Sequence, residues 1–139
     1  MKLEIVTPAQ LVFSGEASYV ALAGTDGDFG VLPGHAPLIS TLRPGVLAVT
    51  QNNSVTKYAV AGGFADVAPA QVTVLVEDII EQRHIDLATT REQLAAAHAE
   101  REALLEAHQN GAKLAKVQQT IDSLRIRVEL AEDWALRKH

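Results

Sequence analysis

The residues best suited to chemistry gather in one run, Gly27–Leu38, whose sequence is GDFGVLPGHAPL. Its carboxylate Asp28 and imidazole His35, with the preceding Asp26, are residue types that serve in acid–base catalysis or as metal ligands. A lone histidine makes a poor metal site, and carboxylates beside glycines are common in turns. Three glycines and two prolines in the run favour fixed turns. We therefore predict a structural or interaction role for it, and no metal site.

Other groups that could support catalysis are scattered along the chain. Gly24–Gly30 is glycine-rich like a phosphate-binding loop, but it lacks the GK[ST] ending and no helical pattern follows it. His98 and His108 are too far apart for the i, i+4 pair of a helical zinc site. The sequence contains no cysteine, and no serine stands in a GxSxG context. We expect no catalytic residue, no metal and no cofactor.

The elements that must position these residues fall into two parts. All five prolines precede residue 70, eight of the nine glycines precede residue 64, and charged residues are denser after residue 84. This shift in composition predicts one domain over residues 1–84 and a second over residues 85–139. The length of 139 residues fits a small domain with an appendage. The net charge of −5 argues against a nucleic-acid binder with a basic surface.

The first part shows short apolar stretches bounded by turn residues, which is the pattern of β-strands. The predicted strands are Leu3–Thr7, Glu16–Ala23, Val46–Thr50, Val55–Ala61 and Gln71–Glu77. Many short strands without a helical period predict a β-sandwich or a small barrel.

The second part changes to a helical period. One helix is expected from Leu87 to about His108, with Asp86 as its N-cap, and Asn110-Gly111 is expected to end it. A second helix is expected from Leu114 onward. Its apolar residues alternate in steps of three and four: Leu114, Val117, Ile121, Leu124 and Val128. The chain is therefore predicted to be α+β, a β-sandwich or barrel followed by an antiparallel αα-hairpin.

The second helix has more apolar residues than a single stripe requires. The stripe is widened towards the end by Ile126, Leu130, Trp134 and Leu136, which predicts more than one partner face for this helix. Arg125 and Arg127 belong to the charged residues of the hairpin. Such residues are either a solvated face or contacts to an acidic partner surface, and their spacing does not choose between the two.

The ordered motifs resemble those of a known family. Gly27–Leu38, then Arg43-Pro44-Gly45, Gly62-Gly63-Phe64 and Val72–Leu75, followed by the change to a helical hairpin, are similar to the epsilon subunit of the bacterial rotary ATP synthase. The resemblance covers the whole chain. Its most specific element is PGHAPL, within Gly27–Leu38.

The resemblance implies a rotor subunit that is not itself an enzyme. The sandwich would bind the gamma subunit and rest on the ring of c subunits, coupling proton flow to ATP synthesis. The c-ring contact would use the acidic position Asp28 and the residues of the same element, Phe29, Gly30, Val31 and His35. The complex would lie at the cytoplasmic side of the bacterial inner membrane, and this subunit would be membrane-associated only through it.

The resemblance also implies a regulatory role for the hairpin. It would fold beside the sandwich or extend along gamma into the alpha/beta catalytic hexamer, where it would inhibit ATP hydrolysis. The helix residues named above, with Arg125 and Arg127, would make these contacts. Epsilon subunits that bind ATP carry an [IL]-D-x-x-R-A motif, which Ile85 and Asp86 match. Thr89 and Thr90 stand where Arg-Ala is expected, so weak or absent nucleotide binding is implied.

A second class of function stays open beside this one. The same sandwich and hairpin would also suit a free-standing adaptor or a small hydrolase. A rotor subunit must co-purify with gamma, whereas an adaptor need not.

Overall fold

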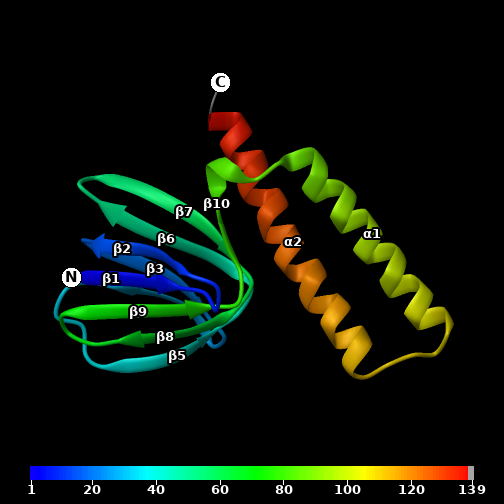
Figure 1. The fold of residues 1–139 in the computed structure, drawn as a ribbon, viewed down its shortest axis with the longest axis horizontal. Helices are drawn as coiled ribbons and strands as arrows, with labels where there is room; N and C mark the ends of the chain where they lie inside the picture. Colours follow the sequence, from blue (N-terminus) through cyan, green and yellow to red (C-terminus); the bar gives the residue numbers. More distant parts are fainter. Residues whose placement is uncertain (138–139) are drawn as a thin grey trace. The chain divides into compact units, whose positions relative to one another are not determined.

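The computed structural model describes residues 1–137 and divides them between two compact units, one up to Glu81 and one from Gln82 onward. The first unit contains ten strands (Figure 1): β1 (Lys2–Val6), β2 (Leu11–Glu16), β3 (Tyr19–Gly24), β4 (Gly27–Val31), β5 (Leu38–Leu42), β6 (Gly45–Gln51), β7 (Ser54–Val60), β8 (Gly63–Val67), β9 (Gln71–Val76) and β10 (Ile79–Glu81). The predicted α+β class, a β-sandwich followed by two helices, is confirmed.

The strands form one continuous hydrogen-bonded arrangement in the order β10-β7-β6-β3-β5-β8-β9-β1-β2, with β4 paired to β3. β1 runs parallel to β9 and antiparallel to β2. In the parallel pair, Leu3 lies opposite Val72 and Ile5 opposite Val74, and all four side chains are fully buried. The strands therefore turn one face towards a shared interior, as the period of two requires.

The core of this unit draws on almost every strand. Its buried members are Leu3, Ile5, Ala17, Val20, Leu22, Val31, Leu42, Leu47, Val49, Tyr58, Val60, Ala65, Val67, Val72, Val74 and Val76. β-branched and leucine side chains dominate, because they fit a pleated, buried surface.

The sequence prediction of five strands was incomplete. The stretch expected as one strand, Glu16–Ala23, is broken at Ala17–Ser18, so that it contributes to both β2 and β3. The run Gly27–Leu38 was expected to be turns, but Gly27–Val31 is the strand β4, and the tight turn precedes it at Thr25–Asp26. Backbone pairing of β4 with β3 outweighs the weak strand propensity of its glycines.

The second unit contains a short 3₁₀ turn, η1 (Gln82–His84), and two helices, α1 (Leu87–Glu106) and α2 (Ala112–Arg137). Asp86 is the N-cap of α1, as predicted: its side chain accepts a hydrogen bond of 2.9 Å from the Thr89 amide. No helix among the described residues is both long and apolar enough to cross a membrane.

The helices meet through a small apolar cluster. Ala97 of α1 and Val117 and Ile121 of α2 are buried, and three partly buried leucines, Leu94, Leu104 and Leu124, pack against them.

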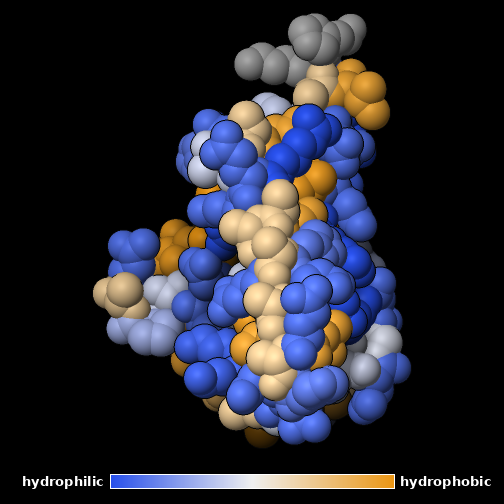
Figure 2. Space-filling view, turned by 90° about the vertical axis from the view of Figure 1, so that its right-hand side faces the viewer, coloured by the Kyte–Doolittle hydropathy of each residue, from blue (hydrophilic) through white to orange (hydrophobic). Residues whose placement is uncertain are grey.

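Figure 2 looks onto the side of the molecule that lies at the right in Figure 1, and its hydrophilic surface is crossed by a narrow, weakly hydrophobic stripe. Alanine has this hydropathy, and Ala88, Ala95, Ala99 and Ala103 of α1 are exposed.

The prediction that Asn110-Gly111 ends the first helix was wrong in detail. The left-handed residue that closes α1 is His108, with φ of 54°. The amides of His108 and Gln109 donate to the carbonyls of Leu105 and Leu104, which is the Schellman arrangement. Gly111, with φ of 87°, instead precedes α2.

The boundary between the units falls after Glu81, whereas composition placed it after His84. The side chain of Gln82 explains the difference. Its Nε2 donates to the Leu130 carbonyl at 2.9 Å and to Asp133 Oδ2 at 3.2 Å, and the residue is only 6% exposed. Gln82 is thus joined to α2, which no local composition could indicate.

Candidate interaction sites

The first candidate site is the tip of the β3–β4 hairpin, which holds Asp28. Asp28 lies opposite Ala23 in the antiparallel pair, and only Gly27 separates it from the Thr25–Asp26 turn. Its Oδ1 accepts a hydrogen bond of 2.5 Å from Nη2 of Arg43, yet its side chain remains 76% exposed. The carboxylate is therefore held in one orientation while it faces solvent.

The residues after Asp28 are held against other parts of the sandwich. A Cβ at Gly30 would lie 1.9 Å from the Tyr19 hydroxyl oxygen, so the Tyr19 ring covers Gly30 and would have to move to admit a larger residue there. Phe29 is partly buried and packs against the core. Val31 is fully buried in the core, so it supports β4 from inside and is not available to a partner.

His35 lies in the connection between β4 and β5 and is half-buried. Its Nδ1 is 2.7 Å from the Ala36 carbonyl oxygen, and because a carbonyl only accepts, Nδ1 carries the proton in this contact. The side chains of Asp28 and His35 thus bond to Arg43 and to Ala36 rather than to each other. No group of three or more His, Cys, Asp or Glu residues capable of holding a metal occurs within residues 1–137.

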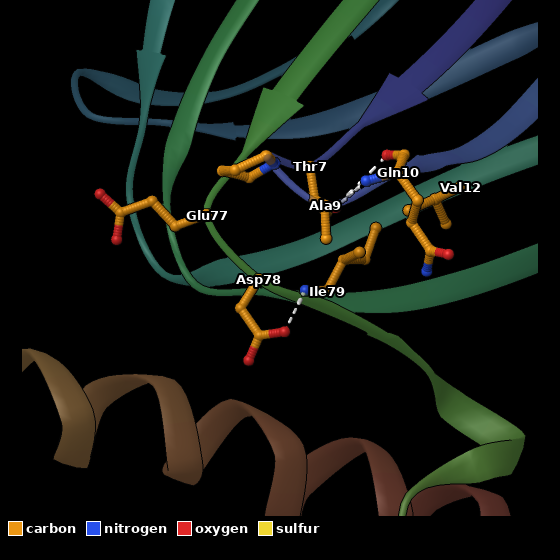
Figure 3. A pocket seen from close by; sticks show the side chains of 8 residues that line it. Thr7, Ala9, Gln10, Val12, Glu77, Asp78 and Ile79 are labelled. Atoms are coloured by element: carbon orange, nitrogen blue, oxygen red, sulfur yellow. Dashed lines mark hydrogen bonds between the residues drawn. The ribbon is translucent and has the colours of Figure 1, made fainter.

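Sequence reasoning did not find two hollows in the sandwich unit. The first, of about 320 Å³, lies between the β1–β2 turn and the β9–β10 connection (Figure 3) and is lined by Thr7, Pro8, Ala9, Gln10, Val12, Glu77, Asp78 and Ile79. The Thr7 hydroxyl accepts from the Gln10 amide at 3.2 Å, and Asp78 Oδ1 accepts from the Ile79 amide at 2.9 Å. These polar groups shape the turns, and none of the eight lining residues is a nucleophile aligned with a base.

The second hollow, of about 450 Å³, is a mainly apolar groove lined by Val6, Thr7, Pro8, Gly63, Phe64, Leu75, Val76 and Glu77. Phe64 lies opposite Leu75, and Leu75 lies opposite Val6, so these side chains form one row across β8, β9 and β1. Phe64 is 44% exposed. Successive residues of a strand point to opposite faces of the sheet, so this row lies on the outer face while residues next to it in sequence are buried.

The predicted contact residues of α2 divide by burial. Val117 and Ile121 are buried in the cluster with Ala97, whereas Leu114, Leu124 and Val128 are half-buried. Trp134 is 39% exposed, and Arg125 is exposed. Arg127 is half-buried and is not without a partner.

The start of α1 shows how the matched nucleotide-motif residues are used. The Asp86 carboxylate accepts from the Thr89 amide, and the Asp86 carbonyl accepts from the Thr90 hydroxyl at 2.6 Å. Thr90 is 5% exposed. Both groups of Asp86 thus complete the first turn of the helix, and the neutral Thr89 adds no positive charge for a phosphate.

These features define a class of protein with a β-sandwich and a helical hairpin, whose exposed groups suit contacts with other proteins. Residues 1–82 match the family described as ATP synthase, Delta/Epsilon chain, beta-sandwich domain. The chain is 44% identical over 100 residues to an ATP synthase epsilon chain of Desulforudis audaxviator, covering 72% of each chain. It is 38% identical over 119 residues to an ATP synthase epsilon chain of Nitrobacter hamburgensis, covering 86% of this chain and 84% of the relative.

The fold is also found in a solved structure of the mitochondrial ATP synthase of Euglena gracilis, with a TM-score of 0.76 and 20% identity, covering 89% of this chain and 76% of that one. The chain therefore belongs to the family of ATP synthase epsilon chains, as the order of its motifs indicated.

Proposed function

We propose that this chain is a rotor subunit of the central stalk, which couples proton translocation to ATP synthesis and catalyses no reaction itself. The observation that carries the proposal is membership of the epsilon family over the sandwich unit. The site geometry supports it, since the Asp28 carboxylate is exposed and held in one orientation by Arg43. The partners are the gamma subunit, the ring of c subunits and the alpha/beta hexamer.

The surface offered to the c ring is the β3–β4 tip with the connection that follows β4. Asp28 supplies the oriented carboxylate, Gly30 lets Tyr19 cover the strand, and His35 lies in the same element. Phe29 and Val31 hold this element on the core. The subunit lies at the cytoplasmic side of the bacterial inner membrane and is held there by the complex.

The hairpin is the regulatory part of the proposal. The apolar cluster that the two helices bury is small. The side chains of α2 that remain to contact gamma and the hexamer in an extended state are half-buried Leu124 and Val128 and exposed Arg125 and Trp134. Two packings of similar free energy make a bistable element. Inhibition of ATP hydrolysis is then a population shift towards whichever state its partners bind better.

ATP bound to this subunit contributes little to that balance. The Asp86 carboxylate is committed to the helix cap, and Thr89 brings no charge to the position where the ATP-binding members of the family carry arginine. Calorimetry of the isolated full-length chain should detect no ATP binding tighter than the millimolar range. Micromolar binding would contradict this part of the proposal.

The central test is deletion of residues 87–139 within the assembled enzyme. ATP hydrolysis is expected to rise because the inhibiting state can no longer form, while the truncated subunit still co-purifies with gamma and supports proton-coupled synthesis. Co-purification with gamma is the control that the sandwich is intact. Unchanged hydrolysis in an enzyme that retains the truncated subunit would remove the regulatory role, and loss of the subunit from the complex would show that the sandwich alone does not suffice for assembly.

A further inference from the structure

Asp28 is held by a network that extends beyond its own hairpin. The Thr25 amide donates to the Thr41 carbonyl at 3.0 Å, and the hydroxyls of the same two residues are 2.6 Å apart. The Arg43 amide donates to the Ala23 carbonyl at 3.0 Å. The tip of the β3–β4 hairpin is therefore fixed against the end of β5 by backbone and hydroxyl contacts alone.

The Arg43 guanidinium adds two further contacts. Its Nη1 donates to the Gly24 carbonyl at 2.5 Å, and its Nη2 donates to Asp28 Oδ1 at 2.5 Å. Gly24 is the last residue of β3 and Asp28 the second of β4, so one guanidinium bridges both strands of the hairpin. The planar fork of arginine fixes the carboxylate in a way that the single ammonium of lysine cannot.

The Asp28–Arg43 pair is exposed, so it should affect the orientation of the Asp28 carboxylate more than the stability of the fold. Both side chains are well exposed, at 43% for Arg43 and 76% for Asp28, and exposed ion pairs contribute little to folding. The tip is already tied down without them. What the guanidinium adds is the orientation of a carboxylate whose Oδ1 is occupied and whose charge is balanced.

We propose that Arg43 is a positioning residue of the docking tip, which presents the Asp28 carboxylate as a pre-oriented acceptor. The inference rests on the proposed function, since it takes the c-ring loops as the partner. The partner surface that fits is a polar loop with hydrogen-bond donors, such as side-chain amides. Because Arg43 balances the charge of Asp28, recognition at this carboxylate depends on donor geometry more than on long-range attraction.

The test uses the whole ATP synthase in membrane vesicles, and its readout is ATP-driven proton pumping divided by ATP hydrolysis. Arg43→Ala and Arg43→Lys are compared with Asp28→Asn. Arg43→Ala is expected to lower this ratio by up to roughly fivefold, the loss that corresponds to one oriented exposed contact. Arg43→Lys should fall in between, because lysine keeps the charge but cannot bridge the Gly24 carbonyl and Asp28 with two nitrogens of one rigid plane. Asp26→Asn is the matched control: it removes the charge of a neighbouring exposed carboxylate without touching Arg43, and should change the ratio little.

The charge-exchanged double variant Asp28→Arg with Arg43→Asp decides between positioning and simple bracing. It can re-form the ion pair, so thermal unfolding of the isolated full-length chain should match the unsubstituted chain, while the pumping ratio stays low because the carboxylate has moved. Recovery of the ratio in this variant would overturn the proposal, since the pair would then be only a brace. A normal ratio for Arg43→Ala beside a low ratio for Asp28→Asn would also overturn it, because Asp28 would dock without help. If neither Asp28→Asn nor Asp28→Ala, which removes the acceptor oxygens altogether, changes the ratio, the c-ring contact in the proposed function fails instead.

Discussion

The two units of this chain are stabilised in different ways. The sandwich buries a continuous core of sixteen residues, drawn from strands that are far apart in sequence. The hairpin buries three residues in its cluster and adds polar contacts between the start of the unit and the end of α2. Buried apolar area is the larger source of stability, so the sandwich should be the more stable unit, and under the proposed function the hairpin is the part that changes its packing.

The strongest test of this comparison removes a side chain from the sandwich core. Ile5 is fully buried on β1, opposite Val74 of β9 and Phe13 of β2. Ile5→Ala should lower the free energy of unfolding by about 2–5 kcal/mol, because it loses apolar burial and leaves a cavity. Urea unfolding of the full-length chain, followed by the fluorescence of Tyr19 and Tyr58, measures it.

Ile39→Ala is the matched control for Ile5→Ala. Ile39 is 73% exposed on β5, so its truncation should change the free energy of unfolding by no more than about 0.5 kcal/mol. Equal effects of the two substitutions would show that the described core is not what stabilises the sandwich.

The same kind of truncation in the hairpin should act locally. Ile121 is 1% exposed, but its cluster is small and can partly collapse, so Ile121→Ala should cost about 2 kcal/mol, the low end of the range for such changes. Trp134 is the one tryptophan of the chain, and its fluorescence should report the loss. Leu136→Ala, at an 80% exposed position, is the control. A parallel shift of the tyrosine-monitored transition would contradict the independence of the two units.

A buried polar contact should matter less than either apolar truncation. Gln82→Ala removes the hydrogen bonds to the Leu130 carbonyl and to Asp133, and should destabilise the hairpin by about 1 kcal/mol. Gln93→Ala, at an exposed position of α1, is the control. The tryptophan-monitored transition should move for Gln82→Ala only. If both variants behave alike, the Gln82 contacts do not hold η1 to α2.

The sequence predicted what depends on local pattern. Asp86 stands before an apolar helical period, and the structure confirms it as the N-cap. The 3–4 spacing identified Val117 and Ile121, which are the buried residues of α2 in the cluster. Local signals of this kind need no knowledge of the rest of the fold.

The features that sequence reasoning missed depend on distant partners. Leu38–Leu42 contains Ser40 and Thr41 and follows Pro37, so it resembles a loop, and it becomes a strand through its pairing with β8. Likewise, Arg43 lies fifteen positions from Asp28, and nothing in the local pattern around either residue shows that they meet. Gln82 and Asp133 are separated by 51 positions. Such pairs follow from the register of the sheet and from the packing of the helices, which the local pattern of a single sequence does not determine.

The smallest effect is expected at the ion pair between the two helices. Arg91 Nη2 lies 3.1 Å from Glu132 Oε2, with the side chains 56% and 49% exposed. Water and salt screen such a pair, and holding two long side chains in place costs entropy, so Arg91→Ala should cost no more than about 0.5 kcal/mol. The tryptophan-monitored transition, measured in low salt and in 1 M salt, separates the charge from the rest of the side chain: the difference between Arg91→Ala and the unsubstituted chain should vanish in high salt, where the screening length is about 3 Å. Arg101→Ala, which removes the intrahelical neighbour of Glu102, controls for loss of an exposed arginine from α1. A loss for Arg91→Ala larger than that for Gln82→Ala would reverse the ranking, and charge at the surface rather than burial would then govern how readily the hairpin opens.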